Sequence, residues 1–136
     1  MGTVMDEELT ERTHRAMPFA ALLGVELDQL EPQEVRARMA WDESRCTSGG
    51  ILHGGALMAL ADCTAGLCAF LNLPEGANAT ATIESKTNFF RPVSSGHVEA
   101  VSRLLHRGRR TIVVETDLRD ADGKHVARVT QTQAVL

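Results

Sequence analysis

The 136-residue sequence has no excess of positive charge, little cysteine and no hydrophobic stretch long enough to cross a bilayer. Its formal net charge is −4, which argues against nucleic acid as a main partner because phosphate-backbone binding needs a basic face. The longest apolar run, residues 56–71, is shorter than the roughly 18 to 20 residues that span a membrane. The first seventeen residues lack the basic-then-apolar profile of a signal peptide. We therefore expect a soluble, cytoplasmic protein with no membrane partner.

The three cysteines are odd in number and show no C-x-x-C spacing. Cys63 and Cys68 both lie within the apolar run, so we expect buried free thiols rather than disulfides or zinc ligands. The acidic pairs Asp42-Glu43 and Asp120-Asp122 are typical of turns, and no metal site is predicted.

The chain contains enough apolar material, 43% of its residues, for the single core of one domain. Residues 6–17 are expected to form a short peripheral helix or a mobile start, and Pro18 to Gly24 a brief apolar turn. Alternating hydrophobicity then predicts strands, which a sheet of five or six would curl around the apolar helix. The predicted strands are a hairpin of residues 25–30 and 34–41, followed after the helix by 80–90, 98–105, 111–119 and 124–135.

The apolar run contains one carboxylate, Asp62. A helix that is apolar on every side is normally buried on every side, and an unpartnered carboxylate in a core costs several kcal/mol. Asp62 is therefore either satisfied by structural hydrogen bonds or kept for chemistry.

His53, Gly54 and Gly55 stand at the expected start of the same helix. Unpaired N–H groups at a helix N-terminus suit a carbonyl oxygen that gains negative charge. His53 lies nine residues before Asp62, about 13 Å along one helix, so the two cannot pair within one chain. In a two-fold dimer with antiparallel helices, however, Asp62 of one chain can approach the His-Gly-Gly end of the other, giving two shared sites.

These residues resemble a known family. The segment Gly50-Ile-Leu-His53-Gly54-Gly55 followed by Leu60-Ala61-Asp62 is similar to the acyl-CoA thioesterases of the hotdog fold, in the PaaI-like subgroup. The strand that ends at Arg91-Pro92 and the basic turn 105–110 resemble the family as well. The resemblance implies an α+β hotdog fold of five or six antiparallel strands around one long helix over residues 18–136, with residues 1–17 as a peripheral segment.

By this resemblance Asp62 is the nucleophile or general base, the Gly54 N–H polarises the thioester carbonyl, and His53 orients the substrate or the loop. Thr82 occupies the place of a Ser or Thr that positions the attacking water in some relatives. Thr47 departs from the family pattern, because relatives commonly carry Asn or Gln there, and a hydroxyl could act in their place through water.

The implied substrate is an acyl-CoA, with no metal or redox cofactor, and the implied assembly is a homodimer with shared sites or a tetramer formed as a dimer of dimers. Arginines near the basic turn could hold the CoA phosphates, and apolar residues of the helix and the next strand could line the acyl slot. The expected substrate-binding residues are Gly55, Leu57, Met58, Phe89, Arg91, His106, Arg107, Gly108, Arg109 and Arg110, with Ala61 and Arg103 as further candidates.

Three functions are consistent with these residues. The first is hydrolysis of an aryl or medium-chain acyl-CoA to free acid and CoA. The second is a non-catalytic acyl-CoA sensor or carrier that uses the same groove, and the third is a hotdog hydratase or dehydratase, whose different His-and-acid motif is not found. The identity of the acyl group and the choice between covalent attack and activated water remain open at this point.

Overall fold

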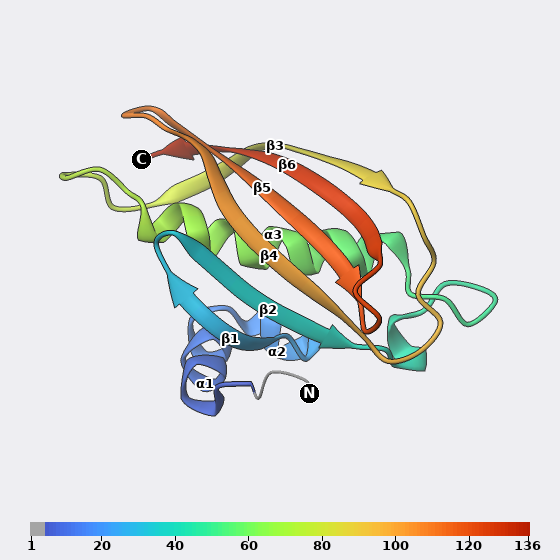
Figure 1. Cartoon of the computed structure of the whole chain (residues 1–136). Helices are drawn as coiled ribbons and strands as arrows, with labels where there is room; N and C mark the ends of the chain where they lie inside the picture. The colour runs from blue at the N-terminus through green and yellow to red at the C-terminus, as the bar shows by residue number, and fades with distance from the viewer. Residues whose placement is uncertain (1–4) are drawn as a thin grey trace.

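A six-stranded antiparallel sheet curls around one long helix, which confirms the predicted α+β hotdog fold (Figure 1). The computed structural model describes residues 5–136. The sheet order is β1-β2-β4-β5-β6-β3. The elements are α1 Glu7–Ala16, α2 Pro18–Leu23, β1 Glu26–Glu31, β2 Glu34–Ala40, a 3₁₀ turn Glu43–Arg45, α3 Gly54–Leu71, β3 Thr80–Phe89, β4 His97–Arg107, β5 Thr111–Asp120 and β6 His125–Val135.

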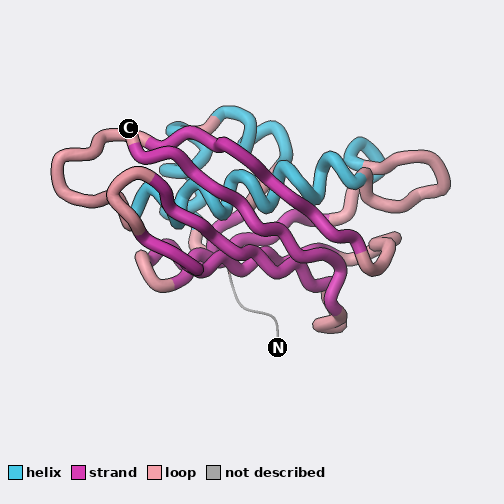
Figure 2. Tube along the Cα trace, turned by 90° about the horizontal axis from the view of Figure 1, so that it is seen from above, coloured by secondary structure: helices cyan, strands magenta, loops and turns pink. Residues whose placement is uncertain are grey.

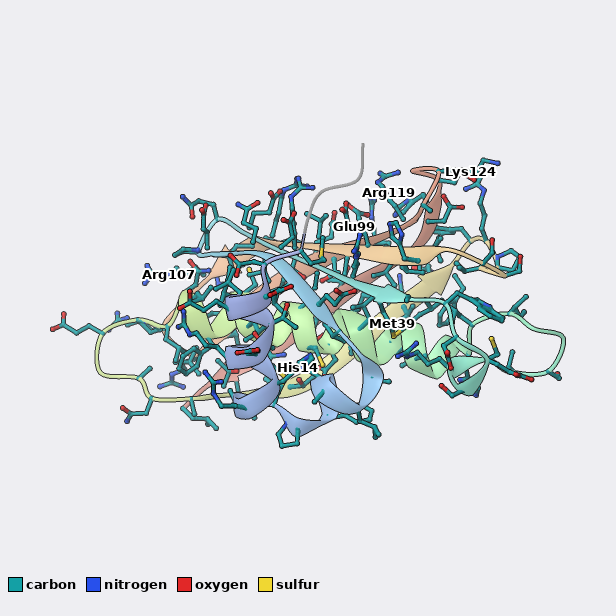
Figure 3. All side chains as sticks on the ribbon, turned by 90° about the horizontal axis from the view of Figure 1, so that it is seen from below. His14, Met39, Glu99, Arg107, Arg119 and Lys124 are labelled. Carbon is teal, nitrogen blue, oxygen red and sulfur yellow. The ribbon has the colours of Figure 1, made fainter. Side chains whose placement is uncertain are left out.

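The core lies between α3 and the concave face of the sheet. Seen from above, the strands form one layer and the helices a second (Figure 2). Helix α3 contacts all six strands. Leu60 on the helix and Met39 on β2 are fully buried, and Figure 3 shows Met39 beside the helix. With Gly54 and Gly55 included, α3 has 18 residues and, contrary to the expectation from the run 56–71, is long and apolar enough to cross a membrane. Its contacts with the sheet make it the core helix of the domain.

One stripe of α3 is not covered. Asp62 is exposed, as are Met58 at 39% and Phe70 at 55%. The expectation that an apolar helix is buried on every side is therefore wrong for the single chain. The sheet covers the rest of the helix and leaves this stripe open.

The outer face of the sheet is charged. Glu34 on β2 accepts a hydrogen bond from Arg36 at 2.7 Å and also pairs with Arg103. Glu99 and Arg119 stand opposite each other on β4 and β5, on the side of the sheet away from α3 (Figure 3). The alternation of inward apolar and outward charged residues is the period-2 pattern from which the strands were predicted.

The two edges of the sheet differ. Edge strand β1 is covered by α1: the Leu27 N–H donates to Thr10 Oγ1 at 2.9 Å, and His14 Nε2 lies 2.6 Å from the Val25 carbonyl oxygen. Edge strand β3 has no partner strand on its outer side among residues 5–136. A ten-residue open edge invites pairing with another strand, and proteins normally protect such edges.

Within residues 6–17 the chain forms helix α1 rather than a mobile start. Asp6 caps α1 by accepting a hydrogen bond from the Leu9 N–H at 3.0 Å. Gly24 ends α2 in the left-handed region, at φ 71°, as predicted. Residues 1–4 of the predicted peripheral segment lie outside the described residues.

Candidate active site

The N-terminus of α3 presents one uncommitted backbone donor. His53 is the N-cap, and its Nδ1 accepts a hydrogen bond from the Gly55 N–H at 2.7 Å. A neutral imidazole that accepts at Nδ1 carries its proton at Nε2. The Ala56 and Leu57 N–H groups bond to the His53 carbonyl oxygen, and the Gly54 N–H has no acceptor among residues 5–136. The cap therefore leaves the Gly54 N–H free for a ligand oxygen.

Gly54 is also a point of close packing. A Cβ on this residue would lie 3.2 Å from the ring of Phe89, at the end of β3. A Cβ on Gly55 would lie 2.9 Å from His53 Nδ1. The two glycines therefore serve the Phe89 contact and the histidine cap, in addition to any open approach for a substrate.

Asp62 lies in a hydrogen-bond network with β3 and β6. Its Oδ1 accepts from Gln131 Nε2 at 2.7 Å and from the Thr82 hydroxyl at 3.3 Å. Thr82 Oγ1 accepts from Gln131 Nε2 at 3.1 Å and from Gln133 Nε2 at 2.9 Å. Asp62 Oδ2 has no hydrogen bond among residues 5–136. One carboxylate oxygen is thus held and the other is available.

Sequence reasoning missed Gln131 and Gln133. Both are almost fully buried, at 0% and 2% exposure, and both continue the inward face of β6 after Val129. Two amides at consecutive inward positions of a strand were a usable signal, because buried polar side chains are hydrogen-bonded or functional. The Thr-Gln-Thr-Gln alternation hid this signal, since neither face of the strand looks apolar there.

The His53-Gly54-Gly55 end of α3 and the network around Asp62 do not meet within one chain. Gly54 and Asp62 are eight residues apart on the same helix, about 12 Å along its axis. Thr82, by contrast, is a hydrogen-bond partner of Asp62 within the chain. Thr47 lies instead in an exposed loop before α3, where its N–H donates to the Ile51 carbonyl oxygen at 2.9 Å.

The basic turn between β4 and β5 is only partly available for an anion. Arg107 donates from Nε to the Asn72 carbonyl oxygen at 2.7 Å, fixing the loop after α3 (Figure 3), and Arg103 is paired with Glu34. Arg91 donates to the His125 carbonyl oxygen at 3.0 Å. Arg103 and Arg107 are thus already engaged within the chain, and their role as phosphate ligands stays a prediction.

A surface hollow of about 500 Å³ remains at this turn. The side chains of Arg109 and Arg110 are exposed there and make no hydrogen bond or ion pair with the described part of the chain. His106, Gly108 and Thr111 complete its lining.

The residues that were expected to line the acyl slot differ in exposure. Leu57 is 4% exposed and Ala61 is 0% exposed, so both point into the core and cannot line a slot in this chain. Met58 and Phe89, at 39% and 50%, are accessible. A hollow of about 350 Å³ lies beside His53 and Gly55. Its apolar lining comes from Phe19 and Leu23 on α2 and from Ala56 and Ala59 on α3.

The cysteines have no catalytic setting. All three are free thiols. Burial raises the pKa of Cys68 to about 11, and burial together with the neighbouring Asp62 charge raises the pKa of Cys63 to about 11. Both side chains belong to the core, as predicted. Residues 5–136 contain no cluster of three or more His, Cys, Asp or Glu side chains suited to a metal ion.

Comparison with known proteins gives a consistent result. The family model described as thioesterase superfamily matches residues 49–127. The proofreading thioesterase EntH of Klebsiella pneumoniae is 34% identical over 118 residues, which is 87% of this chain and 85% of that protein. A solved variant of thioesterase PA1618 from Pseudomonas aeruginosa superposes with a TM-score of 0.87 at 29% identity, covering 96% of this chain and 94% of that one. Thioesterase HI1161 from Haemophilus influenzae gives 0.86 at 28% identity, covering 99% and 92%.

Proposed function

The chain belongs to the thioesterase superfamily, and from this premise we propose that it hydrolyses acyl-CoA thioesters to a free carboxylic acid and CoA. The observation that carries the proposal is the state of Asp62. This carboxylate is exposed, is held through Oδ1 alone, and lies on the uncovered stripe of an otherwise apolar helix. A carboxylate with one free oxygen can remove a proton from water or attack a carbonyl carbon.

The reaction proceeds by addition and elimination. Asp62 Oδ2 takes a proton from water while the water oxygen adds to the thioester carbon, or Oδ2 adds directly to give an anhydride that water then cleaves. The carbonyl oxygen becomes negatively charged in either route, and the Gly54 N–H donates to it. One such donor contributes about 10²- to 10³-fold in rate. Collapse of this adduct breaks the carbon–sulfur bond, and the CoA thiolate leaves and takes up a proton. In the second route this collapse forms the anhydride, and water cleaves the anhydride afterwards.

This reaction requires two chains, because the acid and the donor are about 12 Å apart on one helix. We propose a homodimer in which β3 pairs with β3 of a second copy and the two α3 helices run antiparallel. The open edge of β3 and the exposed Ile83, at 62%, support this arrangement. Met58 is midway between Gly54 and Asp62, so its exposed side chain would face its own copy across the two-fold axis.

The two surface hollows fit the two ends of an acyl-CoA. The hollow beside His53, which Ser44 and Arg45 line together with apolar residues of α2 and α3, has the size of an aryl or medium-chain acyl group. The uncommitted Arg109 and Arg110 offer charge to the CoA phosphates. A tetramer formed from two such dimers is compatible with this assignment, and the charged outer face of the sheet disfavours apolar packing on that side.

A thiol-release screen over aryl and aliphatic acyl-CoAs tests the proposal, with Asp62→Asn as the matched control. We expect turnover by the native chain and none by the variant, with unchanged secondary structure and CoA binding. Tight acyl-CoA binding without thiol release would indicate a sensor instead, and hydration of an enoyl-CoA would indicate a hydratase.

The role of the Gly54 N–H has its own test. Gly54 is the first residue of α3, where proline is tolerated, and His53 at φ −62° and ψ 136° has the extended backbone that a following proline requires. Gly54→Pro therefore removes the donor while keeping the helix start. Gly54→Ala meets the same Phe89 contact but keeps the N–H. We expect a loss of about 10²- to 10³-fold in kcat for the proline variant alone; equal activity of the two variants would rule out this donor.

A further inference from the structure

We infer that Gln131 is a positioning residue for the proposed reaction, which holds Asp62 Oδ1 so that Oδ2 is the reactive oxygen. The inference rests on the proposed function and adds a residue from a strand that the motif does not include. Gln131 lies on β6, 69 residues from Asp62 in the sequence, and donates to Oδ1 at 2.7 Å.

The donor and acceptor inventory of the network assigns the direction of each bond. Thr82 Oγ1 accepts amide hydrogens from Gln131 at 3.1 Å and Gln133 at 2.9 Å. A hydroxyl has two lone pairs and one hydrogen, so both lone pairs are used and its hydrogen is left for Asp62 Oδ1. Thr82 therefore has no lone pair left to accept a hydrogen from water. Its function in this arrangement is to hold Asp62, which differs from the water-positioning role that the resemblance implied.

The local fold builds this arrangement. Thr82 and Gln133 are direct cross-strand partners, and Gln131 is the next inward residue along β6. The register between β3 and β6 shifts between Thr82 and Glu84, so that Ile83 is the extra residue of a bulge. A bulge re-aims the neighbouring side chain, and here it is adjacent to the threonine that contacts Asp62.

Gln131 is a poor choice for stability alone. Its side chain is fully buried, yet Oε1 has no hydrogen-bond partner among residues 5–136. A buried acceptor without a partner destabilises the folded state, and an apolar side chain of the same shape would avoid this cost. The benefit of the glutamine must then lie in the two hydrogens that its Nε2 supplies to Asp62 and Thr82.

Gln131→Met, which keeps the unbranched shape, tests the inference. We expect kcat to fall about 10- to 100-fold, the range for losing a hydrogen bond to a charged group, with KM within about twofold of the native value. The midpoint of urea unfolding should be equal or higher, whereas a merely structural glutamine would lower it. Thr132→Val, on the outward face of the same strand, is the control with native activity. A native kcat in Gln131→Met would overturn the inference.

A second measurement does not depend on turnover. The side-chain amide protons of Gln131, assigned by their loss in Gln131→Met, should shift upfield in Asp62→Ala because the carboxylate acceptor has gone. Unchanged resonances would overturn the inference. If the shift is found but the native chain releases no thiol from any acyl-CoA, the network stands as described and the proposed function is the part that fails.

Discussion

Substituting Gly55 by alanine has two opposite effects on the free energy of unfolding. The new Cβ would lie 2.9 Å from His53 Nδ1 and 3.2 Å from its Cε1, closer than Cβ atoms normally come to a side chain, so the imidazole has to turn away. The hydrogen bond from the Gly55 N–H to Nδ1 is then lost. Loss of an N-cap costs about 1 kcal/mol, with a range of about 0.5 to 2. Alanine in place of glycine in a helix returns about 0.5 to 1 kcal/mol.

The two terms nearly cancel, so we expect Gly55→Ala to change the free energy of unfolding by less than about 1 kcal/mol while moving His53 and lowering kcat/KM. The same substitution made in a His53→Ala background meets no imidazole. There it should stabilise the protein by about 0.5 to 1 kcal/mol. The coupling between the two sites is then about 1 kcal/mol.

Urea unfolding of the native protein, the two single variants and the double variant, all at one protein concentration, measures this coupling. Thiol release measures the effect on activity. An equal effect of Gly55→Ala on stability in both backgrounds would contradict the predicted coupling. That result would mean that His53 does not cap α3 through Nδ1.

Three further predictions concern other parts of the molecule. Ser102 and Thr116 form a fully buried pair of hydrogen-bonded hydroxyls at 2.6 Å. Ser102→Ala should lower the free energy of unfolding in urea by about 1 to 3 kcal/mol, because the Thr116 hydroxyl loses its partner. Adding Thr116→Val should recover most of this loss, since it removes the unpaired hydroxyl. With pKa values of about 11, the Cys63 and Cys68 thiols are about one part in a thousand thiolate at pH 8. A thiol reagent should therefore modify them only after the protein is unfolded in urea. Fast labelling of either thiol in the native protein would contradict their burial. The hydrogen bond from Arg36 lowers the pKa of Glu34 below its ordinary 4.5. The stability advantage over Glu34→Gln should therefore be present above pH 4.5 and disappear as the pH falls through the lower folded value. An advantage that does not change with pH would contradict this pairing.

The fold could be predicted from the sequence because its signals are strong and local. Alternating strands, glycine turns and one long apolar helix lead to a sheet curled around a helix, and the spacing of His-Gly-Gly and Asp62 indicates the two halves of the proposed site. The misplacement of two helix residues has a physical cause. An all-apolar helix has no polar stripe from which to read its orientation, so Leu57 and Ala61 were placed in a slot although they face the core.

Contacts between segments that are distant in the sequence could not be predicted either. The carbonyl oxygen to which Arg107 donates belongs to Asn72, 35 residues away, and nothing in the charge pattern distinguishes this arginine from the free Arg109. Gln131 is linked to Asp62 only through the pairing of β3 with β6, which brings the last strand of the chain against the edge strand. Sequence spacing locates residues along one element, whereas the network at Asp62 joins three elements.

In the proposed dimer, each active site takes its acid from one chain and its N–H donor from the other. Mixing Asp62→Asn with Gly54→Pro protomers, after unfolding and joint refolding, tests it most directly. Each variant alone is expected to be nearly inactive. Random pairing makes half of the dimers mixed, and each mixed dimer has one intact site of two, so about a quarter of native activity should return. Mixed dimers that are detected by native mass spectrometry but release no thiol would contradict the claim.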